Sequence, residues 1–451
     1  MQALFHGWQF LLLELSNCLP DSENIARQMM QVSQQCLNAN QGVPGPESIF
    51  LKLVYSRADL ALVLIQRLAK AKIRNVKDVD QLLGTIVGTI QAVSEPYADD
   101  SVEYYRTLLK SLYVTLRAYQ FGGAGNREKG SDGPTVSVTQ TILNILDRVV
   151  ARGFRLLVSF VHEDDVDVSP EDLGLLTAIL QACLSLPSVD QSQTQIMNIM
   201  AAHDAVHAAT SLFSWADKLT VQGDPVYGEL SILFLLELSA LPLVAEQLAA
   251  DGIVNSLISS NLMKFMLKAN LSPYAETPMA QRSYSIWAKG LLPLLLNLLI
   301  ALGPSVASEV AYVLNLAPHL IQTSVDRFEA PGVSRTRSSA PHYITLLATS
   351  EVHSLALLTR ILNALRVNNS RDIPEISWDA SGMLENAEFW LSGKKLLKER
   401  LMPLGAREVE WRATKPTAGG AETGCENLLE EKVVSQLEAV RTVLREELDG
   451  E

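Results

Sequence analysis

Apolar residues recur along most of this chain at positions i, i+3, i+4 and i+7, which is the period of an amphipathic α-helix. About fifteen segments follow this pattern. No convincing run alternates between apolar and polar residues with the period of two that marks a half-buried strand, and no Asn-Gly or Asp-Gly turn separates β-branched runs. The pattern therefore predicts an all-α fold.

Capping residues mark where several of these helices begin and end. In Ser169–Asp172, a serine that can cap precedes a proline at the first helical position and two acids that face the positive end of the helix dipole. Thr277–Pro278 predicts another helix start, and Gly303–Ser305 ends one helix and begins the next. Gly252 follows an apolar helical stretch, so we interpret it as a helix C-cap.

One segment has the signature of a helical repeat. Leu235–Ser239 leads into Ala245–Leu248 and Gly252–Val254, which resembles the armadillo arrangement of a helix, a tight glycine turn and a helix packed back on it. Armadillo and HEAT repeats run about 40–47 residues. One helix and its loop here average about 30 residues, so a pair of helices is longer than that consensus and the repeat is irregular. We expect an irregular ARM/HEAT-like α-solenoid, a superhelix of stacked antiparallel helices.

Three loop-like stretches interrupt the helical pattern, at 122–134, 330–341 and 413–427. We assign residues 1–412 to the α-helical solenoid, 413–427 to a flexible linker and 428–451 to a C-terminal charged helix. This last helix has one narrow apolar face, so it could dock along the solenoid or project as a tail. The face consists of Leu429, Val433, Leu437, Val440 and Leu444.

Two segments are apolar on nearly every side. Few polar residues interrupt Leu4–Leu15, whereas the end-capping repeat of a solenoid needs a polar outer face, so we expect the chain to be the C-terminal part of a longer solenoid. Ser283–Leu302, which contains Trp287, is predicted to be the most buried helix. Its most apolar run is about a dozen residues long and a bilayer span needs about 20, so we expect the core helix of a soluble protein.

Composition favours a globular protein that is not secreted. Of the 451 residues, 48% are hydrophobic and 19% are charged, which suits a packed core rather than disorder. The net charge of −13 disfavours attraction of the whole surface to nucleic acid or anionic lipid. No signal peptide is evident, and no CxxC pair occurs, so reduced thiols in the cytosol or nucleus are expected. The cysteines are Cys18 and Cys36, which could approach each other, Cys183 and Cys425.

Two patterns are candidates for a metal site. His203 and His207, at i and i+4, would lie on one helix face, but Asp204 stands where a zincin has glutamate and no third ligand cluster is evident. A half-exposed polar face is the better interpretation. The acidic turn His162–Asp167 fails as a calcium loop, because its sixth and twelfth positions, counted from Asp165, are proline and leucine instead of glycine and glutamate.

The remaining signals are weak. Tyr104–Arg106, Tyr113 and Arg117 combine aromatic and basic side chains, but at helical spacing they fit core and rim positions better than a nucleic-acid patch. Arg335–Ser339 is a basic loop open to modification. No nucleophile elbow, Walker loop or dinucleotide fingerprint occurs in the sequence. We predict no enzyme activity, no catalytic or metal-binding residue and no cofactor, and the sequence leaves the protein-binding residues unknown.

Arg282–Leu299 and its sequel Gly303–Ser324 carry a family resemblance. They resemble the C-terminal tail of the large inner-ring scaffold nucleoporins, specifically the fungal nucleoporin 188 family, whose close relative is nucleoporin 192, called nucleoporin 205 in animals. The resemblance extends over Leu4–Leu404 and is most specific around Trp287. It implies a long α-helical superhelix related in shape to nuclear transport receptors.

The resemblance also implies a function. We expect a structural scaffold of the nuclear pore complex inner ring at the nuclear envelope, supporting protein and mRNA transport through contacts with inner-ring and linker nucleoporins. Weak binding of Phe-Gly repeat segments is a second expectation; a single Phe121–Gly122 pair separates this chain from the repeat nucleoporins themselves. No small-molecule substrate, direct nucleic-acid contact or membrane span is expected. The alternatives are a soluble karyopherin-like nuclear transport receptor or adaptor, and an enzyme or metalloprotein built on helices that uses His203 and His207.

Overall fold

The structure, a computed structural model, is built almost wholly from helices, and the predicted all-α fold is confirmed. Within the described residues no β-strand occurs, and the only extended pairings are two isolated bridges, Val221–Asp224 and Ile344–Leu401. The described residues are 2–15, 23–41, 48–70, 76–124, 136–163, 168–268, 271–331, 333, 343–369, 372–422 and 424–448.

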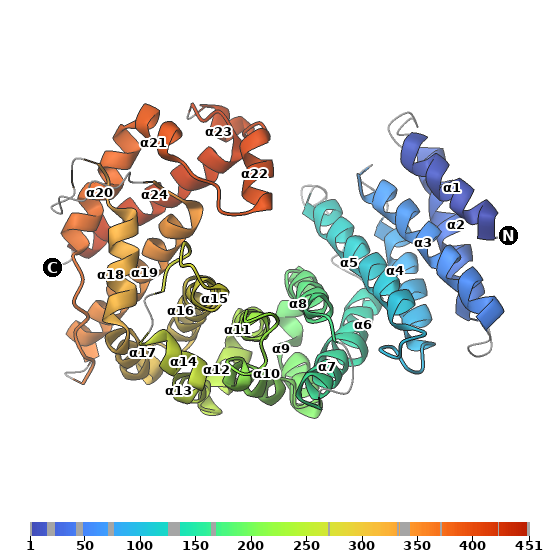
Figure 1. Cartoon of the computed structure of the whole chain (residues 1–451), viewed down its shortest axis with the longest axis horizontal. Coiled ribbons are helices and arrows are strands. Elements are labelled where there is room, and N and C mark those ends of the chain that lie inside the picture. Colours follow the sequence, from blue (N-terminus) through green and yellow to red (C-terminus); the bar gives the residue numbers. More distant parts are fainter. Residues whose placement is uncertain are drawn as a thin grey trace. The chain divides into compact units, whose positions relative to one another are not determined.

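The chain divides into two compact units, Met1–Ala209 and Thr210–Glu451, and α10 (Ala205–Trp215) crosses the boundary. The first unit is a stack of helices, coloured blue to green in Figure 1. Its elements are α1 (Gln2–Leu15), α2 (Glu23–Gln41), α3 (Ser48–Lys70), α4 (Val76–Gln91), α5 (Val102–Ala124), α6 (Val136–Ile145), a π-helical turn (Leu146–Ala151), α7 (Arg152–Glu163), α8 (Pro170–Leu184), a 3₁₀ helix (Pro187–Ser192) and α9 (Gln193–Ala202).

Packing in the first unit follows the two-layer pattern of a helical solenoid. Helix α1 packs on α3, α3 on α5 and α5 on α8, which forms one layer. Helix α2 packs on α4 and α4 on α6, which forms the other, and α2·α3 and α4·α5 contacts join the layers. From α2 to α5, each helix therefore packs against a neighbour in its own layer and one in the opposite layer, as stacked repeats do.

The second unit continues in helices of more varied length. Its elements are α11 (Val226–Ser239), α12 (Pro242–Ala250), α13 (Ile253–Ser259), α14 (Asn261–Met266), α15 (Pro278–Ser285), a π-helical turn (Ile286–Leu291), α16 (Leu292–Leu302), α17 (Pro304–Leu316), α18 (Pro318–Phe328), α19 (Leu346–Asn369), α20 (Ala380–Ser392), α21 (Lys394–Arg400), α22 (Ala406–Ala413), α23 (Ala418–Glu422) and α24 (Leu428–Leu448).

The second unit is built around the helix Pro278–Leu302, which joins α15, the π turn and α16. It packs on α11, α12, α17 and α19, and Trp287 and Tyr284 are fully buried within it. Its length and composition would allow it to cross a membrane, yet more than half of its most apolar window is buried inside the protein. Pro293 lacks a backbone donor, and its ring would clash with the preceding turn of a regular α-helix. The helix accommodates it with the wider π turn, which ends at Leu291. The prediction of a buried core helix here is confirmed.

The predicted helix ends are confirmed where the structure describes them. The Ser169 hydroxyl accepts a hydrogen bond from the Glu171 amide, and the Thr277 hydroxyl accepts one from the Ala280 amide. Gly252 adopts a left-handed conformation with φ of 70° directly after α12, a conformation that favours glycine. Short-range capping chemistry thus fixes several boundaries of this fold.

The C-terminal helix α24 docks, which settles the alternative between a docked helix and a projecting tail. It packs on α19, α20 and α22, and its predicted apolar face is buried against Trp390 and Met383. Between it and α22, the described part of the predicted linker 413–427 includes the short helix α23, and the Thr417 amide donates to Glu431 Oε2 at 2.7 Å. The division of the chain at residue 413 stays a prediction.

Two other predictions concern the apolar first helix and the loops 122–134 and 330–341. On α1, Leu4, Trp8, Phe10 and Leu11 are exposed, so its apolar character continues onto the surface of the unit. The predicted loops 122–134 and 330–341 fall mostly outside the described residues.

Candidate binding site

The histidine pair does not share a helix, so the expectation that both rings lie on one helix face is wrong. Helix α9 ends at Ala202, α10 begins at Ala205, and Asp204 between them has φ of 53°. Aspartate is one of the few residues other than glycine that tolerate this left-handed conformation, which lets the chain turn there. His203 Nε2 lies 2.6 Å from Asp147 Oδ1, whereas His207 is exposed. Among the described residues, no group of three metal-binding side chains is found.

The aromatic and basic residues near Tyr104 occupy core and rim positions, in agreement with the preferred interpretation. Tyr104 and Tyr105 are buried, and Arg106 forms a two-pronged pair with Asp172, from Nε to Oδ1 and from Nη2 to Oδ2, each at 2.7 Å. Arg117 donates to the Gln120 side chain at 3.1 Å. Arg106 is thus committed to joining α5 to α8, because Asp172 is almost wholly buried.

Two other sequence candidates lie partly or wholly outside the described residues. Of the acidic turn His162–Asp167, the structure describes only His162 and Glu163, at the end of α7. Arg335–Ser339 lies outside the described residues. Burial raises the pKa of the Cys36 and Cys183 thiols, which keeps them in the unreactive protonated form.

A buried polar cluster joins three helices of the second unit. The Tyr284 hydroxyl donates to Glu351 Oε2, the Ser324 hydroxyl donates to Oε1 at 2.5 Å, and Arg327 Nη1 lies 3.3 Å from Oε2. Burial raises the pKa of Glu351, opposed by the charge of Arg327 and by the two hydroxyl hydrogen bonds. Tyr284, Ser324 and Glu351 are fully buried, and their hydrogen bonds fix α15, α18 and α19 to one another, so we interpret the cluster as structural.

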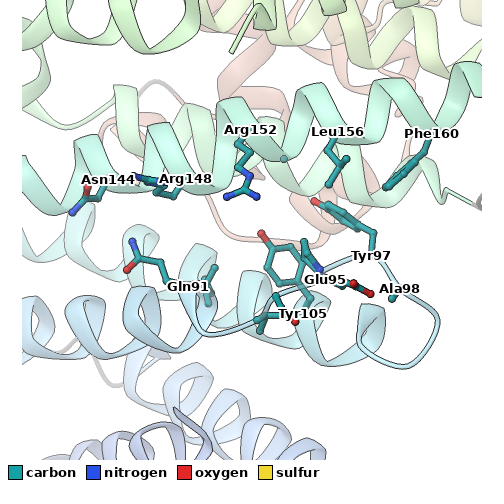
Figure 2. A pocket seen from close by; sticks show the side chains of 15 residues that line it. Gln91, Glu95, Tyr97, Ala98, Tyr105, Asn144, Arg148, Arg152, Leu156 and Phe160 are labelled. Atoms are coloured by element: carbon teal, nitrogen blue, oxygen red, sulfur yellow. The ribbon is translucent and has the colours of Figure 1, made fainter. Parts of the chain in front are cut away.

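The feature most suited to a ligand is a cavity of about 930 Å³ in the first unit (Figure 2). It lies between the end of α4, the turn into α5 and the continuous helix Val136–Glu163. Its volume falls in the range of about 300–1,000 Å³ that is typical of ligand pockets. The lining residues are Ile90, Gln91, Val93, Ser94, Glu95, Pro96, Tyr97, Ala98, Tyr105, Asn144, Arg148, Arg152, Gly153, Leu156 and Phe160.

A π-helical turn shapes one wall of this cavity. Five lining residues of the helix Val136–Glu163 follow one another at intervals of four. In a regular α-helix each step of four overshoots a full turn by about 40°, so four steps would drift by about 160° and carry the last residue to the opposite face. The wider turn at Leu146–Ala151 absorbs part of this drift. The five residues are Asn144, Arg148, Arg152, Leu156 and Phe160.

Of the two arginines that line the cavity, Arg148 is paired with a described carboxylate and Arg152 is not. Arg148 pairs with its neighbour Asp147 at 3.1 Å, and Asp147 also contacts His203. No carboxylate of the described residues lies within ion-pair distance of Arg152, whose guanidinium extends from the helix toward Tyr105 (Figure 2). Glu95 on the opposite wall contributes one carboxylate. The cavity therefore offers a guanidinium that no carboxylate of the described residues neutralises.

Two buried tyrosines, Tyr97 and Tyr105, line the cavity. Burial raises the pKa of Tyr105 to about 12, and it raises the pKa of Tyr97 well above its usual value. The Tyr97 hydroxyl lies near that of Tyr105 yet makes no hydrogen bond to a described residue. It rests against Gly153, where a Cβ atom would meet the hydroxyl at 3.3 Å. Glycine at 153 therefore permits the close approach of this ring.

Of the residues that line the cavity, only Tyr105 was singled out from the sequence, and it was interpreted as a core or rim position rather than as part of a ligand site. The available signal was the spacing of four from Asn144 to Phe160, but a straight α-helix does not place these residues on one face. The opposite wall comes from residues 90–105, which only tertiary packing brings near.

Comparison with known proteins identifies the family. Residues 82–444 match the family described as nuclear pore protein NUP188 C-terminal domain. The chain is 51% identical to nucleoporin NUP188 of Chaetomium thermophilum, over all of this chain and 26% of that protein, and 23% identical to nucleoporin nup184 of Schizosaccharomyces pombe, over 80% of this chain and 22% of that protein. The chain thus spans about a quarter of the length of each of these curated relatives.

A solved structure agrees with this assignment. The structure of Nup188 residues 1445–1827 from Myceliophthora thermophila is 53% identical in sequence and superposes with a TM-score of 0.71, covering 81% of this chain and 98% of that one. The resemblance noted around Trp287 is thereby confirmed. With a family match over most of its length, the chain belongs to the NUP188 family of nuclear pore proteins and corresponds to the C-terminal domain of that family.

Proposed function

We propose that the protein containing this chain is a structural scaffold of the nuclear pore complex inner ring, and that the chain acts in it by protein–protein contacts. The observation that carries the proposal is the family match over residues 82–444. The stacked helices support it, because a two-layer solenoid presents long surfaces to partners. The partners on this proposal are inner-ring and linker nucleoporins, and the chain takes no part in catalysis.

The proposal is tested with the full-length protein carrying a fluorescent tag in fungal cells. A continuous signal at the nuclear rim is expected, and co-purification with inner-ring nucleoporins should survive washing at high salt. A version lacking this segment tests the contribution of the chain itself, and loss of at least one co-purifying nucleoporin is expected. A diffuse signal from the intact protein, or an unchanged set of partners after the deletion, would contradict the proposal.

A second part of the proposal is weak capture of Phe-Gly repeat segments. Stacked helices leave apolar grooves between neighbouring units, into which phenylalanine side chains can insert. Affinity should be low, because a disordered ligand loses conformational entropy and each ring buries little area. Beads carrying a Phe-Gly repeat fragment should retain the chain, and beads carrying the same fragment with every Phe changed to Ser should not. Equal retention on both, or on neither, would reject Phe-specific binding.

A further inference from the structure

We propose that the cavity between α4, α5 and the helix Val136–Glu163 binds a short peptide segment of a partner protein, in which an acidic side chain lies next to a large apolar one. The proposal deepens the scaffold function and rests on it, because it assumes that the ligand is a protein. The proposed ligand differs from a Phe-Gly repeat segment, because such a segment needs no acidic side chain to bind.

The acidic side chain is inferred from Arg152. Arg152 is an exposed residue, and its guanidinium extends into the cavity and has no carboxylate partner among the described residues. Arg148 stands one turn away on the same wall, and its pairing with Asp147 is a solvent-exposed contact of the kind that stabilises little. A ligand carboxylate can therefore take up the fork of Arg152 and gain from the second positive charge nearby.

The apolar neighbour is inferred from the far end of the same wall. Leu156 and Phe160 continue the line of residues beyond Arg152. Phe160 is partly exposed and meets the Tyr97 ring edge to face at 6.5 Å between centroids. A ligand side chain placed here would bury apolar surface beside the ion pair, which lowers the local dielectric and strengthens the pair.

The polar groups around the rim suit a peptide backbone. The side-chain amides of Gln91 and Asn144 are exposed at the end of the cavity near Arg148, and each can both donate and accept. A nucleic acid fits less well, because Glu95 lies in the lining and the chain carries a net charge of −13. The volume of about 930 Å³ accommodates more than a single side chain.

The test begins with a random seven-residue peptide library displayed on phage and panned against the whole chain. Enriched peptides should share an Asp or Glu within two positions of an aromatic or large aliphatic residue. One enriched peptide, labelled with fluorescein, is then titrated by fluorescence anisotropy, beside its version with Asp→Asn or Glu→Gln. Removal of the ligand charge should weaken binding about tenfold or more, and raising the salt concentration should weaken the acidic peptide alone.

Matched variants locate the site. Arg152→Gln should weaken binding about tenfold or more, and Arg148→Gln should weaken it less, because Asp147 already engages that residue. Arg155→Gln is the control: Arg155 is exposed on the same helix and does not line the cavity, so binding should change less than about twofold. Thermal melting of each variant verifies that its fold is intact.

The outcomes are distinguishable. Absence of an acidic consensus, equal binding of the uncharged peptide, tight binding of a labelled oligonucleotide instead, or equal effects of Arg152→Gln and Arg155→Gln would each overturn the cavity proposal. If one of these results is obtained and the tagged full-length protein still gives a nuclear-rim signal, the scaffold function stands. The two proposals therefore fail separately.

Discussion

At the scale of single residues, Gly290 and Gly84 give opposite expectations for the same substitution. A Cβ atom at 290 would lie 2.5 Å from Ile232 Cγ2, a β-branched side chain that is fully buried. Gly290→Ala should therefore overpack the second unit and lower the free energy of unfolding by about 1–3 kcal/mol. Gly84 is exposed within α4 and has nothing within 4 Å, so Gly84→Ala should stabilise by about 0.5–1 kcal/mol. Calorimetric melting measures both, and equal signs would contradict the packing around Gly290.

Glu351 predicts a dependence of stability on pH. Burial raises the pKa of Glu351 in the folded state above its usual value of 4.5, so the folded state holds the proton more tightly than the unfolded state does. The resulting stabilisation is fully present below pH 4.5 and is lost as the pH rises through the raised value, by about 1.4 kcal/mol per unit of pKa difference. Glutamine can keep the hydrogen bonds to Ser324 and Tyr284 but does not titrate.

The stability of Glu351→Gln relative to the native protein should therefore increase as the pH rises above 4.5 and then level off. Urea unfolding at a series of pH values measures this difference, and the other titrating groups cancel because both proteins contain them. A difference that falls with pH would show that the attraction of Arg327 outweighs burial.

The structural roles of some residues follow from local chemistry, and those of others do not. Ser169, Thr277 and Gly252 act through atoms within three positions, so their capping roles follow from sequence. The break between His203 and Asp204 is different, because nothing in the local pattern shows that the helix stops there. His203 contacts Asp147, which lies 56 positions away, and only tertiary structure supplies that partner.

At the scale of elements, apolar coverage on all sides correctly predicts burial of the helix that contains Trp287. Its ring is fully buried, so Trp287→Ala should cost about 3–5 kcal/mol as a core truncation. Chemical denaturation should show a lower midpoint for the second unit. An unchanged midpoint would contradict the packing described here. The π turns were not foreseeable: one precedes Pro293, but the other lies in a helix, Val136–Glu163, that contains no proline to mark it.

The docking of α24 gives a prediction for the end of the chain. Leu437 is fully buried in the same apolar core cluster as Trp390, so Leu437→Ala should cost about 2–5 kcal/mol. Val367, on α19 in the same unit, is 82% exposed, and Val367→Ala should change stability by less than about 0.5 kcal/mol. Hydrogen exchange should also be slow along the middle of α24. Rapid exchange there, with no cost for Leu437→Ala, would indicate a projecting tail.

At the scale of the whole molecule, the fold class was predictable because the helical period repeats along the chain. The division at residues 209 and 210 was not, because α10 carries no composition shift or linker there. The candidate cavity was also beyond reach: residues 90–105 and 144–160 form it only once α4, α5 and the helix Val136–Glu163 pack together. Repetition along the chain predicts architecture, whereas a site formed between repeats depends on packing.

The central claim is that this chain is part of a stable scaffold rather than of a shuttling receptor. Fluorescence recovery after photobleaching of the tagged full-length protein at the nuclear rim tests it most directly. A scaffold held by many contacts should recover over hours or only with new synthesis, and a bleached rim segment should stay dark while its neighbours stay bright. Recovery within seconds, fed by a diffuse nuclear and cytoplasmic pool, would contradict the account.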